Sequence, residues 1–463
     1  MKTSTKLMLA AALLSVGFAN TASADVDVYL TGSSAYRAAV TNAIGHLLTS
    51  PAAAFVSTTT GLGTGGAVAG SGQQLITGQP NATGIADGMT SGTTYWFHTS
   101  WSGSVAGITV LVYGVNTAAK FLPDSETTLA MTVGSGAAGS TADGGNGVPS
   151  TDATVSRTAD GAFSDVFQAS TKYTSPALIG ANSGFGSGVI GVVPFVFVAN
   201  PDATAFVGAT GGKITNIGST QAKSLYGGFQ YLGQFTGNDS DAGYVLPVGR
   251  NFDSGTRVTT LAETGFNPIH IGAATQQPTQ YEVVKTTSGS TTTAVKVDLY
   301  PGETLFSGTP AAATFNSGNS GYSSGGSEAG ALEVSGTSNT ALNTGATSPA
   351  YMIGSLGESD ASNAVKLGCS YLSYDGVAYG SISGTTTSYN RTLLDEGVYT
   401  LWGYEHFYYP SGNGNATVMD AVAKEVTTVD APIAGEKVSN MAVQRAYEGG
   451  PISYVGVGGT SGL

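Results

Sequence analysis

The chain contains little charge and a single cysteine. Charged residues make up 10% of its 463 residues, and Cys369 is the one cysteine. One cysteine cannot form an intramolecular disulfide, which excludes a scaffold held together by disulfides. No histidine is close to Cys369 in the sequence to activate its thiol. We therefore expect a small buried residue beside Tyr371 and Leu372.

Histidines are also few, and they are scattered at positions 46, 98, 270 and 406. Zinc sites place their ligands in pairs a few residues apart, and these four residues show no such spacing. The sequence therefore predicts no metal site and no cofactor. It shows no evident Ser–His–Asp set either, so an enzyme such as an extracellular hydrolase is the least favoured class of function.

Long apolar runs are confined to the N-terminus, so no membrane-spanning segment is expected elsewhere. There, two lysines precede the apolar stretch 7–18, and Ala22-Ser23-Ala24 fits the small-residue pattern of a cleavage site. We expect residues 1–24 to be a secretory signal peptide cleaved after Ala24. The mature protein would then be periplasmic or extracellular.

Basic residues are scarce, with 17 Lys and Arg against 30 Asp and Glu. Loss of the signal peptide removes two of the lysines and no acid, which leaves 15 basic residues and a net charge of −15. This balance argues against nucleic acid and anionic membrane surfaces as partners. It does not exclude a small anion, because solvent and salt screen distant charges.

Apolar residues are plentiful enough for a large core, at 41% of the chain, and they are accompanied by 68 glycines. The length favours two lobes over one. Gly, Ser and Thr are concentrated in 49–93 and in 134–150, and the second of these stretches is expected to be a mobile surface loop. In 288–347, Gly/Ser/Thr tracts alternate with short strand-like pieces.

Two segments share a strand–turn–helix pattern. A strand expected at 26–30 is followed by a helix over 35–48, and a strand at 244–248 is followed by a helix over 257–263. Such units, joined by long crossovers, predict α/β lobes. In these lobes, ligands collect where strands end and helices begin.

Other elements fit the same class. The pattern predicts buried strands at 108–113 and 189–199, an aromatic strand at 398–409 and a helix over 418–429. The aromatic segment 94–101 is expected to form an excursion of strands or a hairpin.

The most informative stretch is Gly249-Arg250-Asn251-Phe252-Asp253-Ser254-Gly255-Thr256-Arg257. A strand that turns through Ser-Gly-Thr into a helix directs free N–H groups and the helix dipole at one point. Hydroxyl donors and an arginine able to form two parallel hydrogen bonds complete an oxyanion receptor. The alternative is an ordinary helix start, with Ser254 or Asp253 as the N-cap and Arg250 in solvent.

Four segments place polar groups at such turns: 31–36, 113–117, 160–165 and 250–256. Their order and chemistry resemble the periplasmic phosphate-binding protein of the phosphate ABC transporter, a type II periplasmic binding protein. The segments 190–200, 215–228 and 397–409 resemble further elements of that family. The resemblance spans most of the mature chain, with weak identity and large insertions.

The resemblance implies an α/β fold with a two-lobed type II periplasmic-binding-protein architecture and Gly/Ser/Thr-rich loop insertions. Residues 25–203 and 396–463 would form the first lobe, and residues 204–395 the second. The implied function is binding of a tetrahedral oxyanion, foremost inorganic phosphate, between the lobes. The implied partner is an ABC permease, and no catalysis is expected.

The resemblance also implies site residues. In the second lobe these are Arg250, Ser254, Gly255 and Thr256, and in the first lobe Thr117 matches a hydroxyl donor. Asp165 matches a carboxylate that accepts the proton of hydrogen phosphate, and such an acceptor-only group rejects fully ionised sulfate. The first turn would contribute Ser33, Ser34 or the N–H groups of Ala35 and Tyr36.

Two residues depart from the family pattern. Tyr36 stands where the family usually has Thr, and Asp253 stands where it usually has Gly. The carboxylate of Asp253 would repel a phosphate dianion unless it points away, for example toward Arg257.

An alternative function is that of a secreted structural or adhesive protein that reuses this fold without a ligand. The two functions predict different sites. Binding requires Thr117, Asp165, Arg250, Ser254 and Thr256 to converge on a cleft, whereas the adhesive alternative predicts a blocked or dispersed set.

Overall fold

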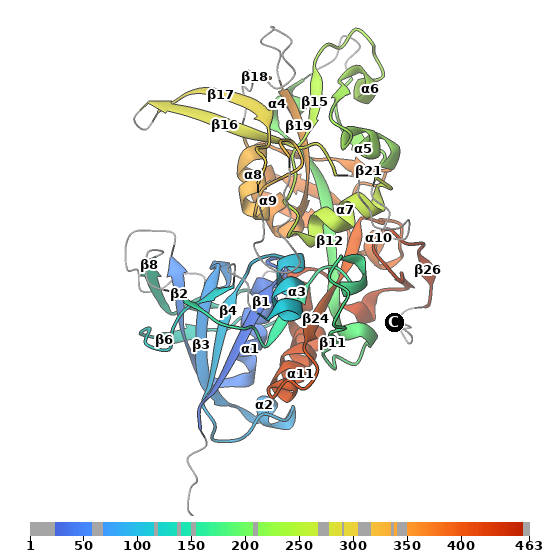
Figure 1. The fold of residues 1–463 in the computed structure, drawn as a ribbon. Helices are drawn as coiled ribbons and strands as arrows, with labels where there is room; N and C mark the ends of the chain where they lie inside the picture. The colour runs from blue at the N-terminus through green and yellow to red at the C-terminus, as the bar shows by residue number, and fades with distance from the viewer. Residues whose placement is uncertain are drawn as a thin grey trace, which may run out of the picture.

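The protein is a two-lobed α/β structure (Figure 1). The computed structural model describes residues 24–57, 68–114, 119–136, 140–149, 154–206, 212–266, 277–288, 291–303, 316–334, 338–339 and 350–456. The expected signal peptide up to residue 23 and the candidate ligand Thr117 lie outside these residues.

One long mixed sheet runs through both lobes, in the order β14-β15-β19-β12-β24-β10-β1-β4-β3-β2-β6-β7. The first-lobe strands are β1 (Val26–Gly32), β2 (Leu48–Ser57), β3 (Gln73–Pro80), β4 (Tyr95–Ser100), β6 (Leu129–Thr132), β7 (Asp143–Gly144), β8 (Asn146–Pro149) and β10 (Gly161–Ser164). Strand β1 is parallel to both β4 and β10, so the three strands end at the same edge of the sheet.

Helices cover both faces of the first-lobe sheet. They are α1 (Arg37–Leu47), α2 (Ala82–Ala86), α3 (Ser104–Tyr113), α11 (Ala416–Glu425) and α12 (Ala431–Ala434). Neighbouring residues of one strand point to opposite faces, so Phe163 belongs to the core shared with α1, and Ala162 to the core shared with α3. Strand β10, covered on both faces, is therefore buried along its whole length.

The second lobe repeats the arrangement. Its sheet strands are β14 (Gln230–Tyr231), β15 (Tyr244–Pro247) and β19 (Ala350–Gly357), of which β15 and β19 are parallel. Its helices are α4 (Pro201–Ala205), α5 (Ser219–Leu225), α6 (Gly233–Thr236), α7 (Gly255–Glu263), α8 (Gly325–Leu332), α9 (Glu358–Lys366) and α10 (Arg391–Asp395). The hairpins β16 (Tyr281–Ser288)–β17 (Thr291–Leu299) and β22 (Gly380–Ser383)–β23 (Thr386–Tyr389) extend from this lobe.

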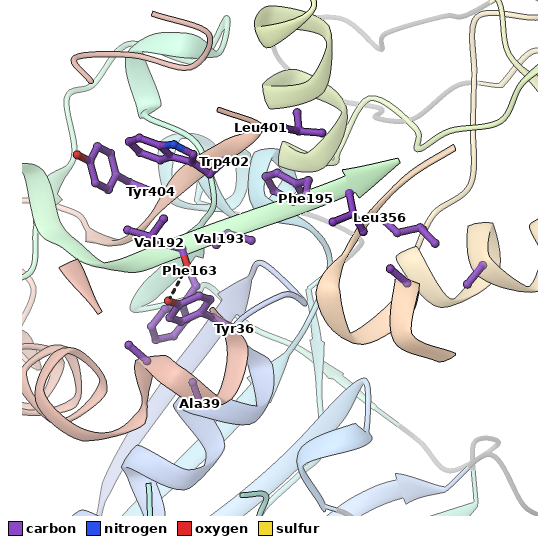
Figure 2. Packing of buried hydrophobic residues seen from close by; sticks show 14 of the residues in the cluster. Tyr36, Ala39, Phe163, Val192, Val193, Phe195, Leu356, Leu401, Trp402 and Tyr404 are labelled. Atoms are coloured by element: carbon purple, nitrogen blue, oxygen red, sulfur yellow. Dashed lines mark hydrogen bonds between the residues drawn. The ribbon is translucent and has the colours of Figure 1, made fainter. Parts of the chain in front are cut away.

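Two fully buried strands join the lobes. The first part of β12 (Val189–Ala199) pairs with β24 (Trp402–Tyr409), and its last five residues pair with β19. Figure 2 shows the resulting core, in which Trp402 and Phe195 lie on one side of β12. On the other side the hydroxyl of Tyr36 reaches the carbonyl of Val192.

Many sequence-based assignments are confirmed, and others are wrong. The strands expected at 26–30, 189–199, 244–248 and 398–409 and the helices expected over 35–48, 257–263 and 418–429 overlap β1, β12, β15, β24, α1, α7 and α11. The segment 94–101, expected as an excursion or a hairpin, is instead β4, which lies between β1 and β3 in the main sheet. Residues 108–113, however, belong to helix α3. Their apolar run predicts a strand. Helix α3, however, is buried along most of its length because it packs between the first-lobe sheet and the second lobe. A short apolar run does not distinguish a buried strand from a buried helix.

Candidate functional site

A cleft of about 660 Å³ lies where the two lobes meet. Its walls include the N-terminal ends of five helices, α1, α3, α7, α8 and α9. Four of them follow the parallel strands β1, β4, β15 and β19, so the carboxyl ends of the parallel strands of both lobes face the cleft. This is the position at which α/β sheets bind ligands, because helix N-termini carry partial positive charge and free N–H groups.

The first turn contributes Ser33, Ser34 and Ala35 to the cleft wall. The N–H of Ser33 donates to the carbonyl of Phe163 at 2.8 Å, and its hydroxyl accepts from the N–H of Ala35 at 3.3 Å. These bonds fix the turn between β1 and α1.

Tyr36 does not line the cleft with this turn. Its side chain is fully buried, and its hydroxyl donates to the carbonyls of Val192 and Glu436. The departure from the family's Thr therefore serves packing against β12.

Asp165 lies directly after β10 and faces the cleft with 2% of its surface exposed. Its Oδ1 atom is buried and has no hydrogen-bond partner. Burial raises the pKa of Asp165 to about 6. The Ser104 hydroxyl and the charge of Arg250 both favour the ionised carboxylate and so lower this pKa, but their effect is smaller. The carboxylate thus has one unpaired, buried acceptor atom at the edge of the cleft.

Gly255, the first residue of α7, contacts this carboxylate from the second lobe. A Cβ atom at position 255 would lie 1.5 Å from Oδ1 of Asp165 and 3.0 Å from Cβ of Ser104. Only glycine allows the α7 N-terminus to approach so closely.

Arg250, Ser254 and Thr256 also line the cleft. The guanidinium of Arg250 is held by the carbonyls of Tyr322 and Ser323, to which its Nε and Nη2 donate at 3.2 and 3.1 Å. Burial lowers the pKa of Arg250, and nearby carboxylates oppose this effect, Glu328 and Asp360 most strongly. The arginine is therefore a fixed cation at the cleft and is not solvated.

Ser254 is the N-cap of α7, as one of the two sequence interpretations expects. Its hydroxyl accepts from the N–H of Arg257 at 3.4 Å as the N-cap of α7, and the residue also lines the cleft. Arg257 itself is buried and donates to the carbonyls of Arg250 and Asn319 and to the side chain of Gln277.

Asp253, the second departure, is not among the residues that line the cleft. Burial and the charge of Glu303 raise its pKa to about 6, and Lys172 and Arg250 act in the opposite direction. Its carbonyl accepts a 3.0 Å hydrogen bond from the N–H of Val105, near the start of α3. This bond joins the two lobes beside the cleft.

Sequence reasoning missed several cleft residues. Ser104 is the first residue of α3. The sequence could have indicated it, because the segment Ser100-Trp101-Ser102-Gly103-Ser104 at the end of β4 repeats the strand–turn–helix pattern of 31–37. Other residues that it missed include Arg37, residues 324–326 at the start of α8, residues 357–360 at the start of α9, and Arg391. Arg391 donates two parallel hydrogen bonds to Glu358, at 2.6 and 2.7 Å.

Two groups of side chains within the described ranges have the spacing of metal ligands: Asp27, His98 and Asp124, and His46, Glu425 and Asp430. Both lie away from the cleft wall. Their members are far apart in the sequence, which is why ligand spacing along the chain did not show them. His46 is held by two carboxylates that raise its pKa to about 10, and a cationic imidazolium accounts for that group.

Cys369 is buried, as expected, and burial raises the pKa of its thiol to about 12. A buried thiol with this pKa is not a nucleophile at neutral pH. Among the described residues, none of the helices has both the length and the apolar character needed to cross a membrane.

No protein-family model and no curated protein sequence matches this chain. Among solved structures, this chain is similar to one from Clostridium perfringens that is described as a phosphate ABC transporter substrate-binding protein with bound phosphate. The two sequences are 10% identical, and the alignment covers 88% of this chain and 94% of the other, with a TM-score of 0.38. An ABC-type phosphate transport receptor from Vibrio cholerae is 9% identical over 87% and 94% of the two chains, with a TM-score of 0.38. PstS from Borrelia burgdorferi is 12% identical over 86% and 92%, with a TM-score of 0.34. Similarity at this level carries no conclusion about what this chain binds.

Proposed function

We propose that this protein is a solute-binding protein that holds a tetrahedral oxyanion, foremost phosphate, between its lobes. One observation carries the proposal: the buried Oδ1 of Asp165 has no partner and lies in a cleft walled by five helix N-termini and Arg250. An unpaired buried acceptor is costly unless a ligand pairs with it. A protonated oxyanion is such a ligand.

The cleft supplies the two kinds of groups that hydrogen phosphate needs. Arg250, the Ser254 hydroxyl and the N–H groups at the helix starts donate to its oxygens. Asp165 accepts its proton, because an ionised carboxylate only accepts hydrogen bonds. Sulfate has no proton to offer at neutral pH, so the same carboxylate repels it.

The site also favours binding over the alternative of a ligand-free adhesive protein. That alternative predicts a blocked or dispersed set of residues, whereas Asp165, Arg250, Ser254 and Thr256 all line one open cleft. A hydrolase needs a nucleophile paired with a base, and the described residues of the cleft wall include no histidine.

The lobes would close over the ligand by bending at β12 and β24, the two strands that join them. We place the first lobe at residues 25–203 and 396–463 and the second at 204–395. A periplasmic location and delivery of the bound anion to an ABC permease complete the proposal.

Titration calorimetry with phosphate, arsenate and sulfate tests this function. We expect phosphate and arsenate to bind at one site and sulfate to bind at least tenfold more weakly. A protein that binds none of the three, and no phosphate ester, is not an oxyanion-binding protein.

A further inference from the structure

The cleft is much larger than an inorganic phosphate ion. A phosphate ion fills roughly the volume of two or three waters, about 60–90 Å³. The cleft measures about 660 Å³, which falls within the range of roughly 300–1,000 Å³ typical of sites for organic ligands.

Contacts between the lobes already exist beside the oxyanion groups. The Val105 N–H donates to the Asp253 carbonyl at 3.0 Å, and the Lys172 ammonium lies 4.7 Å from the centre of the Phe252 ring. Asp165 and Gly255 also meet there. These contacts join the lobes on this side, and the cleft extends beside them.

The remaining wall has a different chemistry, and we call it the hydroxyl-lined half. Its polar residues include Arg37, Asp360, Ser362, Thr387 and Tyr389, and the apolar residues Ala38, Val193, Ile433 and Ala434 also line it. The Ser362 and Thr387 hydroxyls bond each other at 2.6 Å, and the Tyr389 hydroxyl donates to the Glu358 carbonyl at 2.5 Å. Hydroxyls, a carboxylate and a guanidinium beside apolar surface suit a ligand whose polar groups both donate and accept and whose carbon skeleton packs against the wall.

Asp360 connects the two halves. Burial raises the pKa of its carboxyl, and the charges of Arg250 and Arg37 both oppose that effect. The carboxylate therefore lies within electrostatic reach of the oxyanion groups on one side and of α1 on the other. Its Oδ2 atom packs against the start of α8, where a Cβ atom at Gly325 would lie 2.0 Å away.

Charges balance among the residues of the cleft wall that the structure describes. Arg37, Arg250 and Arg391 are matched by three carboxylates, those of Asp165, Glu358 and Asp360. Outside the oxyanion groups the wall thus offers no net attraction for more negative charge. It offers hydrogen bonds to neutral polar groups.

We infer that the ligand is a phosphate monoester of a polyhydroxylated compound, such as a sugar phosphate, with its phosphate at Asp165 and Arg250 and its hydroxyls against the hydroxyl-lined half. This inference rests on the proposed oxyanion site and names the class of ligand for it. Inorganic phosphate fills only one end of the cleft and leaves the other end to water.

Calorimetry with inorganic phosphate, glycerol 3-phosphate and glucose 6-phosphate tests the inference, with free glucose as the phosphate-free control. We expect at least one ester to bind tenfold or more tightly than inorganic phosphate, and glucose alone to show no binding. Inorganic phosphate binding as tightly as every ester would overturn the inference and leave the proposed function intact. No binding of phosphate or ester would overturn both.

Two variants that fill the hydroxyl-lined half sharpen the result. Ala434→Trp and Ala38→Trp each place a large side chain on the cleft wall from the first lobe, and Ala434→Ser is the matched small control. We expect either tryptophan to weaken ester binding at least tenfold while the affinity for inorganic phosphate changes less than threefold. Equal loss of both ligands in both folded variants would contradict a divided cleft.

Discussion

Gly255 of the second lobe and Asp165 of the first are in direct contact across the cleft, since a Cβ atom at 255 would lie 1.5 Å from Asp165 Oδ1. Gly255→Ala should therefore push the carboxylate out of place and weaken phosphate binding more than tenfold. The overpacked contact should also cost about 1–3 kcal/mol of stability. Calorimetry and chemical denaturation of the variant measure the two effects.

Gly330→Ala is the matched control, because Gly330 lies inside α8 and a Cβ atom added there would meet no neighbouring atom within 4 Å. Alanine in a helix interior is favoured over glycine by about 0.5–1 kcal/mol. This control should bind normally and be slightly more stable. Normal phosphate affinity in Gly255→Ala would show that the contact is dispensable.

Arg250→Ala should weaken oxyanion binding more than any other single substitution in the cleft. It removes a fixed, charge-assisted donor, worth about 2–5 kcal/mol when the partner stays buried. It also leaves the Tyr322 and Ser323 carbonyls without the arginine donors. Arg157→Ala, which removes an exposed arginine outside the cleft, is the control; equal affinities in the two variants would place the binding site elsewhere.

Asp165→Asn should change selectivity. Asparagine supplies a donor and removes a negative charge, so sulfate should gain on phosphate by roughly 1–3 kcal/mol. Competition between the two anions in wild type and variant gives the ratio. An unchanged ratio, with wild type binding phosphate, would exclude Asp165 from the ligand contacts.

The same substitution should alter how stability depends on pH. The pKa of Asp165 is raised to about 6 in the folded protein, above the ordinary value of 3.8, mainly by burial. The folded state therefore holds the proton more tightly, and this contribution to stability is lost as pH rises from about 4 to about 6. Asp165→Asn should be more stable than wild type at pH 7.5 by about 1–3 kcal/mol and should match it more closely at pH 4.

Denaturation of both proteins across this pH range checks that expectation. Glu405 is a second buried carboxyl group that interacts with Asp165. Burial and the charge of Asp165 raise the pKa of Glu405 well above the ordinary value. Removing the Asp165 charge should ease ionisation of Glu405, so the variant's remaining pH dependence should shift to lower pH. A variant with the wild-type pH profile would show that Asp165 is solvated.

Tyr36 and Gly191 should be energetically coupled. A Cβ atom at 191 would lie 1.9 Å from the Tyr36 hydroxyl oxygen, so Gly191→Ala alone should destabilise the protein by about 1–3 kcal/mol. Tyr36→Leu shortens the side chain and should reduce the cost of the added methyl group. A double-mutant cycle measures the coupling, and strictly additive free energies would rule out this pairing.

The sequence could predict the Arg250 to Thr256 turn because its signal is local. A strand, a Ser-Gly-Thr turn and a helix follow one another within twenty residues, and the structure has β15 and α7 there. The same pattern predicted β1 and α1. Asp165 was predicted as a site residue from the order of segments shared with the phosphate-binding family. It lines the same cleft as Arg250.

Other features depend on partners that local patterns do not identify. Tyr36 bonds carbonyls 156 and 400 residues away, so its packing role was invisible. The strand predicted within α3 is wrong because the apolar residues of this helix face two lobes at once. That error directed attention to Thr117 and away from Ser104, which lines the cleft. The lobe boundaries and the roles of the cleft residues remain predictions.

A crystal structure grown with phosphate tests the central claim most directly. The account predicts phosphate in the cleft, with one oxygen within hydrogen-bond distance of Asp165 Oδ1 and others at the Arg250 guanidinium and the N-terminus of α7. The account would be contradicted by phosphate bound outside the cleft, or by a cleft without phosphate in which Oδ1 is bonded to another side chain of the protein.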